Sequence, residues 1–126
     1  MNLGFIGTGR ISSSVIEGIF KSNLKIKKIY ISPRNRIIAN KLNKRFKKVY
    51  ISKNNQQLVD KSNWVFLAVT PKIGNKILKK LNFKKNQKII SFISTINLAQ
   101  LKKMIGKKLK IVRAIPLPPI SIRKGP

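Results

Sequence analysis

The stretch of sequence that decides the fold is NLGFIGTGRISSSVIEGIF, residues 2–20. Its apolar residues 3–7 predict a short buried strand, which runs into two glycines one residue apart, Gly7 and Gly9. Residues 10–20 then carry apolar side chains at helical spacing, which predicts an amphipathic helix. The glycines have two interpretations: a loop that holds a phosphate, or only a tight turn between a strand and a helix.

The composition excludes several kinds of catalytic site. The 126 residues contain no Cys and no His, which excludes disulfides, reactive thiolates, His- or Cys-ligated metals and general acid–base catalysis by His. The two carboxylates, Glu17 and Asp60, are far apart in the sequence, which disfavours a paired-carboxylate mechanism. We predict no metal site, assign no catalytic residue, and place residues 1–126 in a single domain.

The charge is the most unusual property of the chain. It has 29 Lys and Arg residues against 2 acidic ones, a formal net charge of +27, and such a surface attracts nucleic acid and other polyanions. The basic residues are spread along the whole chain, and the excess of Lys, Asn and Ile is typical of an adenine- and thymine-rich genome. We therefore favour codon bias and solvated basic faces over a dedicated site, and expect nucleic acid to bind only nonspecifically.

Beyond residue 20 the chain alternates between strand-like and helix-like segments. The apolar run WVFLAV at 64–69 has the pattern of a central strand buried on both faces. The alternation predicts an α/β fold: a Rossmann-type doubly wound parallel sheet of about six strands, with helices on both faces. Strands are predicted at 3–7, 28–32, 49–51, 64–69, 88–94 and 109–115, and helices at 10–20, 35–46, 54–61, 73–81 and 97–106.

The apolar runs also bear on the location of the protein. Every uninterrupted apolar run is far too short to cross a bilayer, so we expect no membrane partner. The N-terminus lacks the basic-then-apolar pattern of a signal peptide, because the glycine-rich turn comes at once. We therefore expect a cytoplasmic location. The proline-rich residues 116–126 cannot form a central strand or a helix interior.

Within this fold, the segment GTGRIS at 7–12 has the features of a phosphate-binding turn. Gly7 permits the tight turn out of the first strand, and Gly9 allows a pyrophosphate to approach the backbone. Ser12 is nearly as small as the Gly or Ala that normally lets the helix pack closely on the strand. The free N–H groups and the positive dipole end of the helix then face the phosphates.

The end of the second strand indicates which dinucleotide would bind. An NAD-binding domain usually has Asp or Glu there to hold the ribose hydroxyls, but this chain reads ISPRNR at 31–36, with Ser32, Arg34 and Arg36 and no acid. Because Arg and Ser hold a 2′-phosphate that a carboxylate would repel, we predict NADP as cofactor, with NADPH preferred over NADH. With 29 cations in the chain, the missing acid is the stronger argument.

Together these segments resemble a known family. GFIGTGRISSSVIEGI, YISPRN, NNQQLVDKSNWVFLAVTPK, IISFIST, LAQLKKMIG and KIVRAIPLPP are similar, in order and spacing, to the N-terminal dinucleotide-binding domain of pyrroline-5-carboxylate reductases. That family is related to the F420-dependent NADP oxidoreductases, and AVTPK and VRAIP are the most specific parts of the resemblance.

The resemblance implies an NADPH-dependent reductase that converts the cyclic imine pyrroline-5-carboxylate to proline. It implies a pyrophosphate turn, contacts with the adenosine 2′-phosphate and ribose, and a border along the nicotinamide and the cleft. The pyrophosphate turn would consist of Gly7, Thr8, Gly9, Arg10 and Ile11. The 2′-phosphate would meet Ser32 and Arg34, and the adenine ribose would lie beside Asn55. The nicotinamide would be bordered by Val69, Thr70, Pro71 and Lys72, and the cleft would be lined by Ser94 and Thr95.

The chain also departs from the family pattern. Arg10 stands where the family usually has Asn, and Leu117 and Pro118 replace the polar residues of a Met-Pro-Asn-Thr-Pro run on the substrate side. A different cyclic imine or a related carbonyl substrate therefore remains open. The family continues into a helical C-terminal domain that forms the dimer and completes the substrate site. The resemblance therefore implies a homodimer, or a separate chain that carries that domain.

Two other functions stay open beside the reductase. One is a non-catalytic remnant that still binds NADP, and the other is a basic module that binds nucleic acid or another polyanion. Most aromatic residues fall on predicted strands or apolar helix faces, which argues against a platform for stacking bases. We also expect apolar surface to be exposed near residues 115–122 if the second domain is missing.

Overall fold

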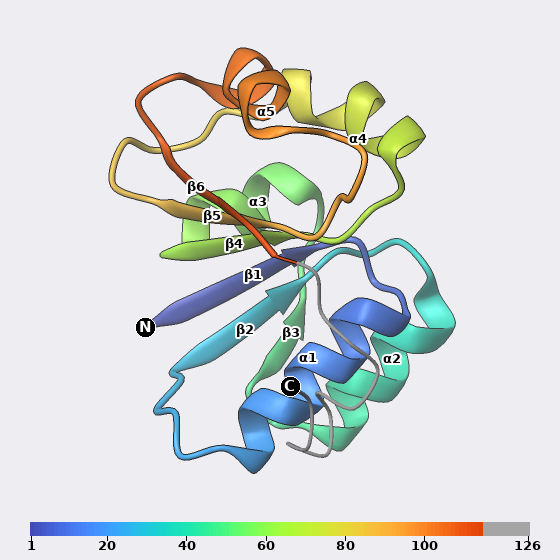
Figure 1. Cartoon of the computed structure of the whole chain (residues 1–126). Coiled ribbons are helices and arrows are strands. Elements are labelled where there is room, and N and C mark those ends of the chain that lie inside the picture. Colours follow the sequence, from blue (N-terminus) through green and yellow to red (C-terminus); the bar gives the residue numbers. More distant parts are fainter. Residues whose placement is uncertain (115–126) are drawn as a thin grey trace.

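The computed structural model describes residues 1–114, in which strands and helices alternate along the chain (Figure 1). All six strands pair in parallel in one sheet. The elements are β1 (Asn2–Ile6), α1 (Arg10–Lys21), β2 (Lys28–Ile31), α2 (Arg36–Arg45), β3 (Val49–Ile51), α3 (Asn55–Lys61), β4 (Trp64–Leu67), α4 (Pro71–Ile77), the 3-10 helix η1 (Leu78–Lys80), β5 (Lys88–Ser91), α5 (Leu98–Ile105) and β6 (Lys110–Arg113).

The strand order is β3-β2-β1-β4-β5-β6. The chain therefore builds outward from β1 to β3, crosses back, and builds outward again from β4 to β6. Helices α1 and α2 lie on one side of the sheet, and α3, α4 and α5 lie on the other (Figure 1). This arrangement is the doubly wound parallel α/β fold expected from the sequence. It places the carboxyl ends of β1 and β4 side by side, where such folds bind ligands.

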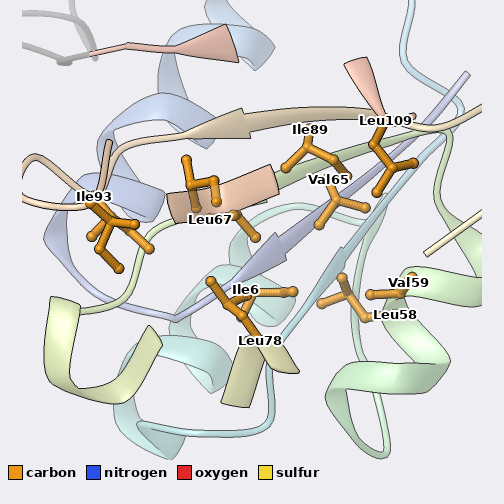
Figure 2. Packing of buried hydrophobic residues seen from close by; sticks show 11 residues of the cluster. Ile6, Leu58, Val59, Val65, Leu67, Leu78, Ile89, Ile93 and Leu109 are labelled. Atoms are coloured by element: carbon orange, nitrogen blue, oxygen red, sulfur yellow. The ribbon is translucent and has the colours of Figure 1, made fainter. Parts of the chain in front are cut away.

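The sheet separates two hydrophobic cores. The core on the α3 side includes Ile6, Leu67 and Leu78, all fully buried, and Figure 2 shows how its aliphatic side chains meet between the sheet and the helices. The core on the α1 side includes Phe5 and Phe66, whose rings stack with centroids 4.4 Å apart. Successive residues of β1 and β4 thus contribute side chains to both cores, as expected for strands buried on both faces.

Several elements end earlier than the sequence predicts. The strands expected at 64–69 and 88–94 end at Leu67 and Ser91, and the single helix expected at 73–81 is α4 followed by the 3-10 turn η1. Helix α4 begins at Pro71, whose missing N–H is no loss in a first turn, and the Thr70 hydroxyl accepts a hydrogen bond from the Ile73 N–H. The predictions for residues 115–126 lie outside the described residues.

Helix length also bears on membrane association. No helix within residues 1–114 combines the length and the apolar character that crossing a membrane requires.

Candidate functional site

The turn between β1 and α1 contains one glycine that the fold itself requires. Gly7 has φ = +98°, a conformation that side chains rarely adopt. A Cβ atom at Gly7 would lie 2.3 Å from the Ala68 carbonyl oxygen and 2.8 Å from the Val69 side chain. The close approach of this turn to the chain after β4 therefore depends on the absence of a side chain.

Gly9 is different. Its φ of −129° and ψ of −161° are extended backbone that any residue adopts, and a Cβ atom there would meet no atom within 4 Å. Neither conformation nor packing therefore explains this glycine. Gly9 is also the N-cap of the 12-residue helix α1, and the helix start has no side-chain cap. The open space in front of its backbone fits a group that approaches from outside and accepts hydrogen bonds from the first-turn N–H groups.

Three hydroxyl groups hold the turn in this shape. The Ser12 hydroxyl donates to the Gly7 carbonyl at 2.5 Å, and the Thr8 hydroxyl donates to the Ser32 carbonyl at 2.8 Å. The Ser32 hydroxyl accepts a hydrogen bond from the Gly7 N–H at 2.9 Å. All three side chains are buried, so the turn is tied both to α1 and to the end of β2. A shape fixed in advance lowers the cost of ordering a ligand there.

The structure brings Ser32 and Asn55 together. The Ser32 hydroxyl lies 2.6 Å from Asn55 Oδ1, to which it donates, and Ser32 is only 1% exposed. Asn55 is the first residue of α3, so this contact joins the ends of β1, β2 and the start of α3. The Ser32 hydroxyl thus makes its hydrogen bonds within the protein, with the turn and with Asn55.

Exposed side chains surround the turn. Arg10 and Ile11 form the beginning of α1, and Arg34 lies in the loop between β2 and α2. The two carboxylates of the chain are elsewhere: Glu17 in α1 pairs with Arg45, and Asp60 in α3 accepts a hydrogen bond from Gln56. The segments that follow β2 and β3, residues 32–35 and 52–54, therefore contain cationic and neutral groups only.

A cavity of about 290 Å³ lies between α2 and the end of β3. Ser52 is 3% exposed, and its buried hydroxyl has no hydrogen-bond partner within residues 1–114. Among the residues that line this cavity, the sequence analysis singled out only Arg36. The other lining residues belong to no motif, and they come together only because α2 connects β2 to β3. The cavity is lined by Pro33, Arg36, Ala39, Asn40, Ile51, Ser52 and Lys53.

The other residues expected at the site follow β4 and β5. Val69 lies against the Gly7 turn, Thr70 and Pro71 begin α4, and Lys72 is exposed. Ser94 and Thr95 are exposed in the loop after β5. The Ser94 carbonyl accepts a hydrogen bond from Arg113 Nη2 at 2.5 Å, which sequence reasoning did not anticipate. Parallel pairing places all these residues along the same edge of the sheet as the glycine turn.

Comparison with known proteins relates this geometry to a family. A family model described as NADP oxidoreductase, coenzyme F420-dependent, matches residues 2–97. A curated relative, pyrroline-5-carboxylate reductase 2 of Bacillus subtilis (strain 168), is 25% identical over 125 residues, which is 98% of this chain and 45% of that protein.

Solved structures of such reductases have the same fold. The 1-pyrroline-5-carboxylate reductase of Streptococcus pyogenes is similar with a TM-score of 0.81 and 29% identity, over 97% of this chain and 45% of that one. The pyrroline carboxylate reductase of Plasmodium falciparum, solved with NADP bound, has a TM-score of 0.81 and 23% identity, over 97% of this chain and 44% of that one. The chain thus spans a little under half the length of these relatives.

Proposed function

Because the chain belongs to the family of coenzyme F420-dependent NADP oxidoreductases, we propose that it holds NADP(H) as the cofactor-binding part of a reductase. The reaction is reduction of pyrroline-5-carboxylate, or of a related cyclic imine or carbonyl, as in the reductases that it resembles. The observation that carries the proposal is Gly9, a glycine that the protein's own conformation and packing do not explain.

In this proposal the pyrophosphate lies against the turn from Gly7 to Ile11. The N–H groups of the first turn of α1 donate to phosphate oxygens, and the helix dipole favours the negative charge. Arg10 adds a cation at the helix start, at a position where the chain departs from the family pattern. Thr8 and Ser12 keep their hydrogen bonds to the protein and fix the turn.

NADPH is preferred over NADH because the adenosine end meets cations and hydroxyls. Arg34 is exposed in the loop between β2 and α2, and Arg36 and Lys53 line the cavity between α2 and the end of β3. The unpartnered Ser52 hydroxyl in that cavity is a donor well suited to a phosphate oxygen. Ser32 contributes indirectly, since it positions Asn55 for the adenine ribose. A carboxylate, which would repel a 2′-phosphate, is absent from the ends of β2 and β3.

NADPH, when bound, supplies the hydride. The chain's own residues orient the cofactor: Val69, Thr70, Pro71 and Lys72 border the nicotinamide end, and Ser94 and Thr95 line the cleft. This positioning role needs no titratable group, which agrees with a chain that has no His and no Cys. Since the chain spans about 45% of its relatives, we propose that residues outside this sequence complete the substrate site.

The experiment is a fluorescence titration of the full chain with NADPH and NADH near physiological salt. Excess tripolyphosphate occupies nonspecific cationic sites. We expect NADPH to bind more tightly than NADH, and Arg34→Ala to narrow the difference. Gly9→Asp should weaken NADPH binding about 10-fold or more, because a carboxylate then occupies the phosphate position.

The same substitution separates binding from folding. Asp is a favourable N-cap, so Gly9→Asp should not lower the melting temperature. Gly18→Ala, in the same helix but away from the turn, is the matched control and should bind NADPH like the wild type. If tripolyphosphate displaces both nucleotides together and Gly9→Asp has no effect, the glycines form only a turn and the proposal is wrong.

A further inference from the structure

One face of the sheet exposes aromatic rings beside lysines. We define the tyrosine surface as Lys28, Tyr30, Tyr50 and Lys61. Tyr30 in β2 and Tyr50 in β3 are register partners, so both rings lie on the same side of the sheet. Tyr30 packs at the margin of the α3-side core, whereas Tyr50, on the edge strand, is 42% exposed. The α3-side helices thus stop short of this corner of the sheet.

The two rings form a continuous surface. Their centroids are 6.0 Å apart with an angle of 34° between the planes. The Lys28 ammonium lies 5.4 Å from the centroid of Tyr50, and the Lys61 ammonium lies 5.6 Å from the centroid of Tyr30. Each ring is therefore paired with a lysine cation. The fold gains little from an exposed ring at Tyr50, since its buried neighbour Val49 already anchors β3 in the α1-side core.

We propose that the tyrosine surface binds single-stranded nucleic acid by stacking bases on Tyr50 and Tyr30. Aromatic side chains on adjacent strands of an open sheet face are a common way to hold unpaired bases. Lys28 and Lys61 would leave the rings and pair with the flanking phosphates. The net charge of +27 supplies the long-range attraction that brings a polyanion to this face.

The surface is separate from the proposed cofactor site. Lys28 begins β2, at the amino end of the strands, and Tyr30 pairs with Gly4, whereas the glycine turn follows the carboxyl end of β1. The cavity that contains Ser52 lies on the α2 side of β3, and Tyr50 is on the opposite side. The proposal therefore does not depend on NADP binding. It adds to the nonspecific attraction of nucleic acid a specific contact, the stacking of bases on Tyr50 and Tyr30, which a substitution can remove.

The test is fluorescence anisotropy of a labelled dT12 oligonucleotide with the full chain, across a salt series. Tyr50→Ala removes the ring and leaves the charge unchanged, so we expect dT12 to bind about 5- to 100-fold more weakly at moderate salt. Tyr50→Phe keeps the ring and should bind like the wild type. Ile37→Ala, an exposed apolar residue in α2, is the matched control and should have no effect.

A ligand without bases distinguishes stacking from charge. Inorganic polyphosphate should bind the wild type and Tyr50→Ala with equal affinity, because both carry the same cations. Circular dichroism shows that each variant is folded at the assay temperature. If folded Tyr50→Ala binds dT12 as tightly as the wild type, or if Tyr50→Phe loses as much affinity as Tyr50→Ala, the proposal is overturned.

Discussion

At the scale of single residues, the two glycines of one turn have different causes. Gly7 is required by the chain itself, because its positive φ and the Ala68 carbonyl exclude a side chain. Gly9 has ordinary backbone angles and free space, so neither strain nor packing within residues 1–114 requires a glycine there, and we propose that it leaves room for a ligand. The sequence motif assigned the tight turn to Gly7 and the approach of a phosphate to Gly9, and the structure adds the positive φ and the close contact that make a side chain at Gly7 unfavourable.

A prediction at this scale concerns Ser52. Its buried hydroxyl lacks a partner within the described chain, so Ser52→Ala should leave the free energy of unfolding unchanged or raise it by about 1 kcal/mol. If the hydroxyl donates to the 2′-phosphate, the same variant should bind NADPH about 3- to 10-fold more weakly and NADH unchanged. Urea unfolding and nucleotide titration measure the two effects.

The control for Ser52 is Ser62→Ala. Ser62 is similarly buried, but its hydroxyl donates to the Leu58 carbonyl at 2.7 Å. This variant should lose about 1 kcal/mol of stability and keep its preference for NADPH. Equal losses of NADPH and NADH affinity in Ser52→Ala would show that the cavity does not recognise the 2′-phosphate.

The sequence predicted part of the candidate site at this scale. The glycine turn was found because Gly7, Gly9 and Ser12 lie within one short motif. The cavity was missed because Asn40 and Ser52 are twelve positions apart and neither belongs to a motif. The family resemblance placed Ser32 and Asn55 at the same adenosine end, but the direct hydrogen bond between them was not predicted, because it depends on the packing of the start of α3 against the end of β2.

At the scale of elements, the sequence predicted the strands and helices well but not their ends. Apolar runs and glycine or proline positions mark where elements exist. Strand ends depend on pairing: β1 ends at Ile6 because Gly7 turns the chain, and β4 therefore ends at Leu67, the partner of Ile6. The apolar residues Ala68 and Val69 extend the sequence pattern beyond the point where a partner strand exists.

The start of α5 supports a second prediction. The Asn97 side chain accepts from the Gln100 N–H at 2.8 Å, and Gln100 Oε1 accepts from the Asn97 N–H at 2.9 Å, which forms a capping box. Asn97→Ala should lower the free energy of unfolding by about 1 kcal/mol, because the helix loses its cap. Chemical denaturation measures the change.

Asn75 provides the comparison for this cap. It is exposed inside α4 and caps nothing, so Asn75→Ala should leave stability unchanged or raise it slightly, since Ala is the better helix former. If Asn75→Ala and Asn97→Ala destabilise the protein equally, the capping box contributes nothing.

At the scale of the whole molecule, the dominant property is the charge. Arg45 pairs with Glu17 at a site that is exposed at the arginine, and with 29 basic residues against 2 acidic ones the cations of the chain mostly repel one another. We predict that raising NaCl from about 0.02 M to about 0.5 M increases the free energy of unfolding by roughly 1–2 kcal/mol. Urea denaturation at each salt concentration measures this.

A charge variant separates screening from general salt effects. Replacing the exposed lysines Lys76, Lys79 and Lys103 with Gln should raise stability at low salt and flatten the salt dependence. An unchanged slope would mean that the salt acts on apolar burial instead of on charge repulsion. From the sequence we interpreted most aromatic residues as core, and the pairing of Tyr30 with Tyr50 and the exposure of Tyr50 on the edge strand β3 became visible only in the structure.

The division into two cores has a consequence for synthesis on the ribosome. Within residues 1–114, nine of the ten buried residues of the α1-side core lie between Leu3 and Val49, and only Phe66 comes later. The α3-side core takes Ile6 from the start of the chain and the rest from Leu58 onward. The growing chain can therefore pack most of the α1-side core as it emerges from the ribosome. Strand β4 can then pair with the β1 strand that is already in place, and the second half of the sheet assembles from there.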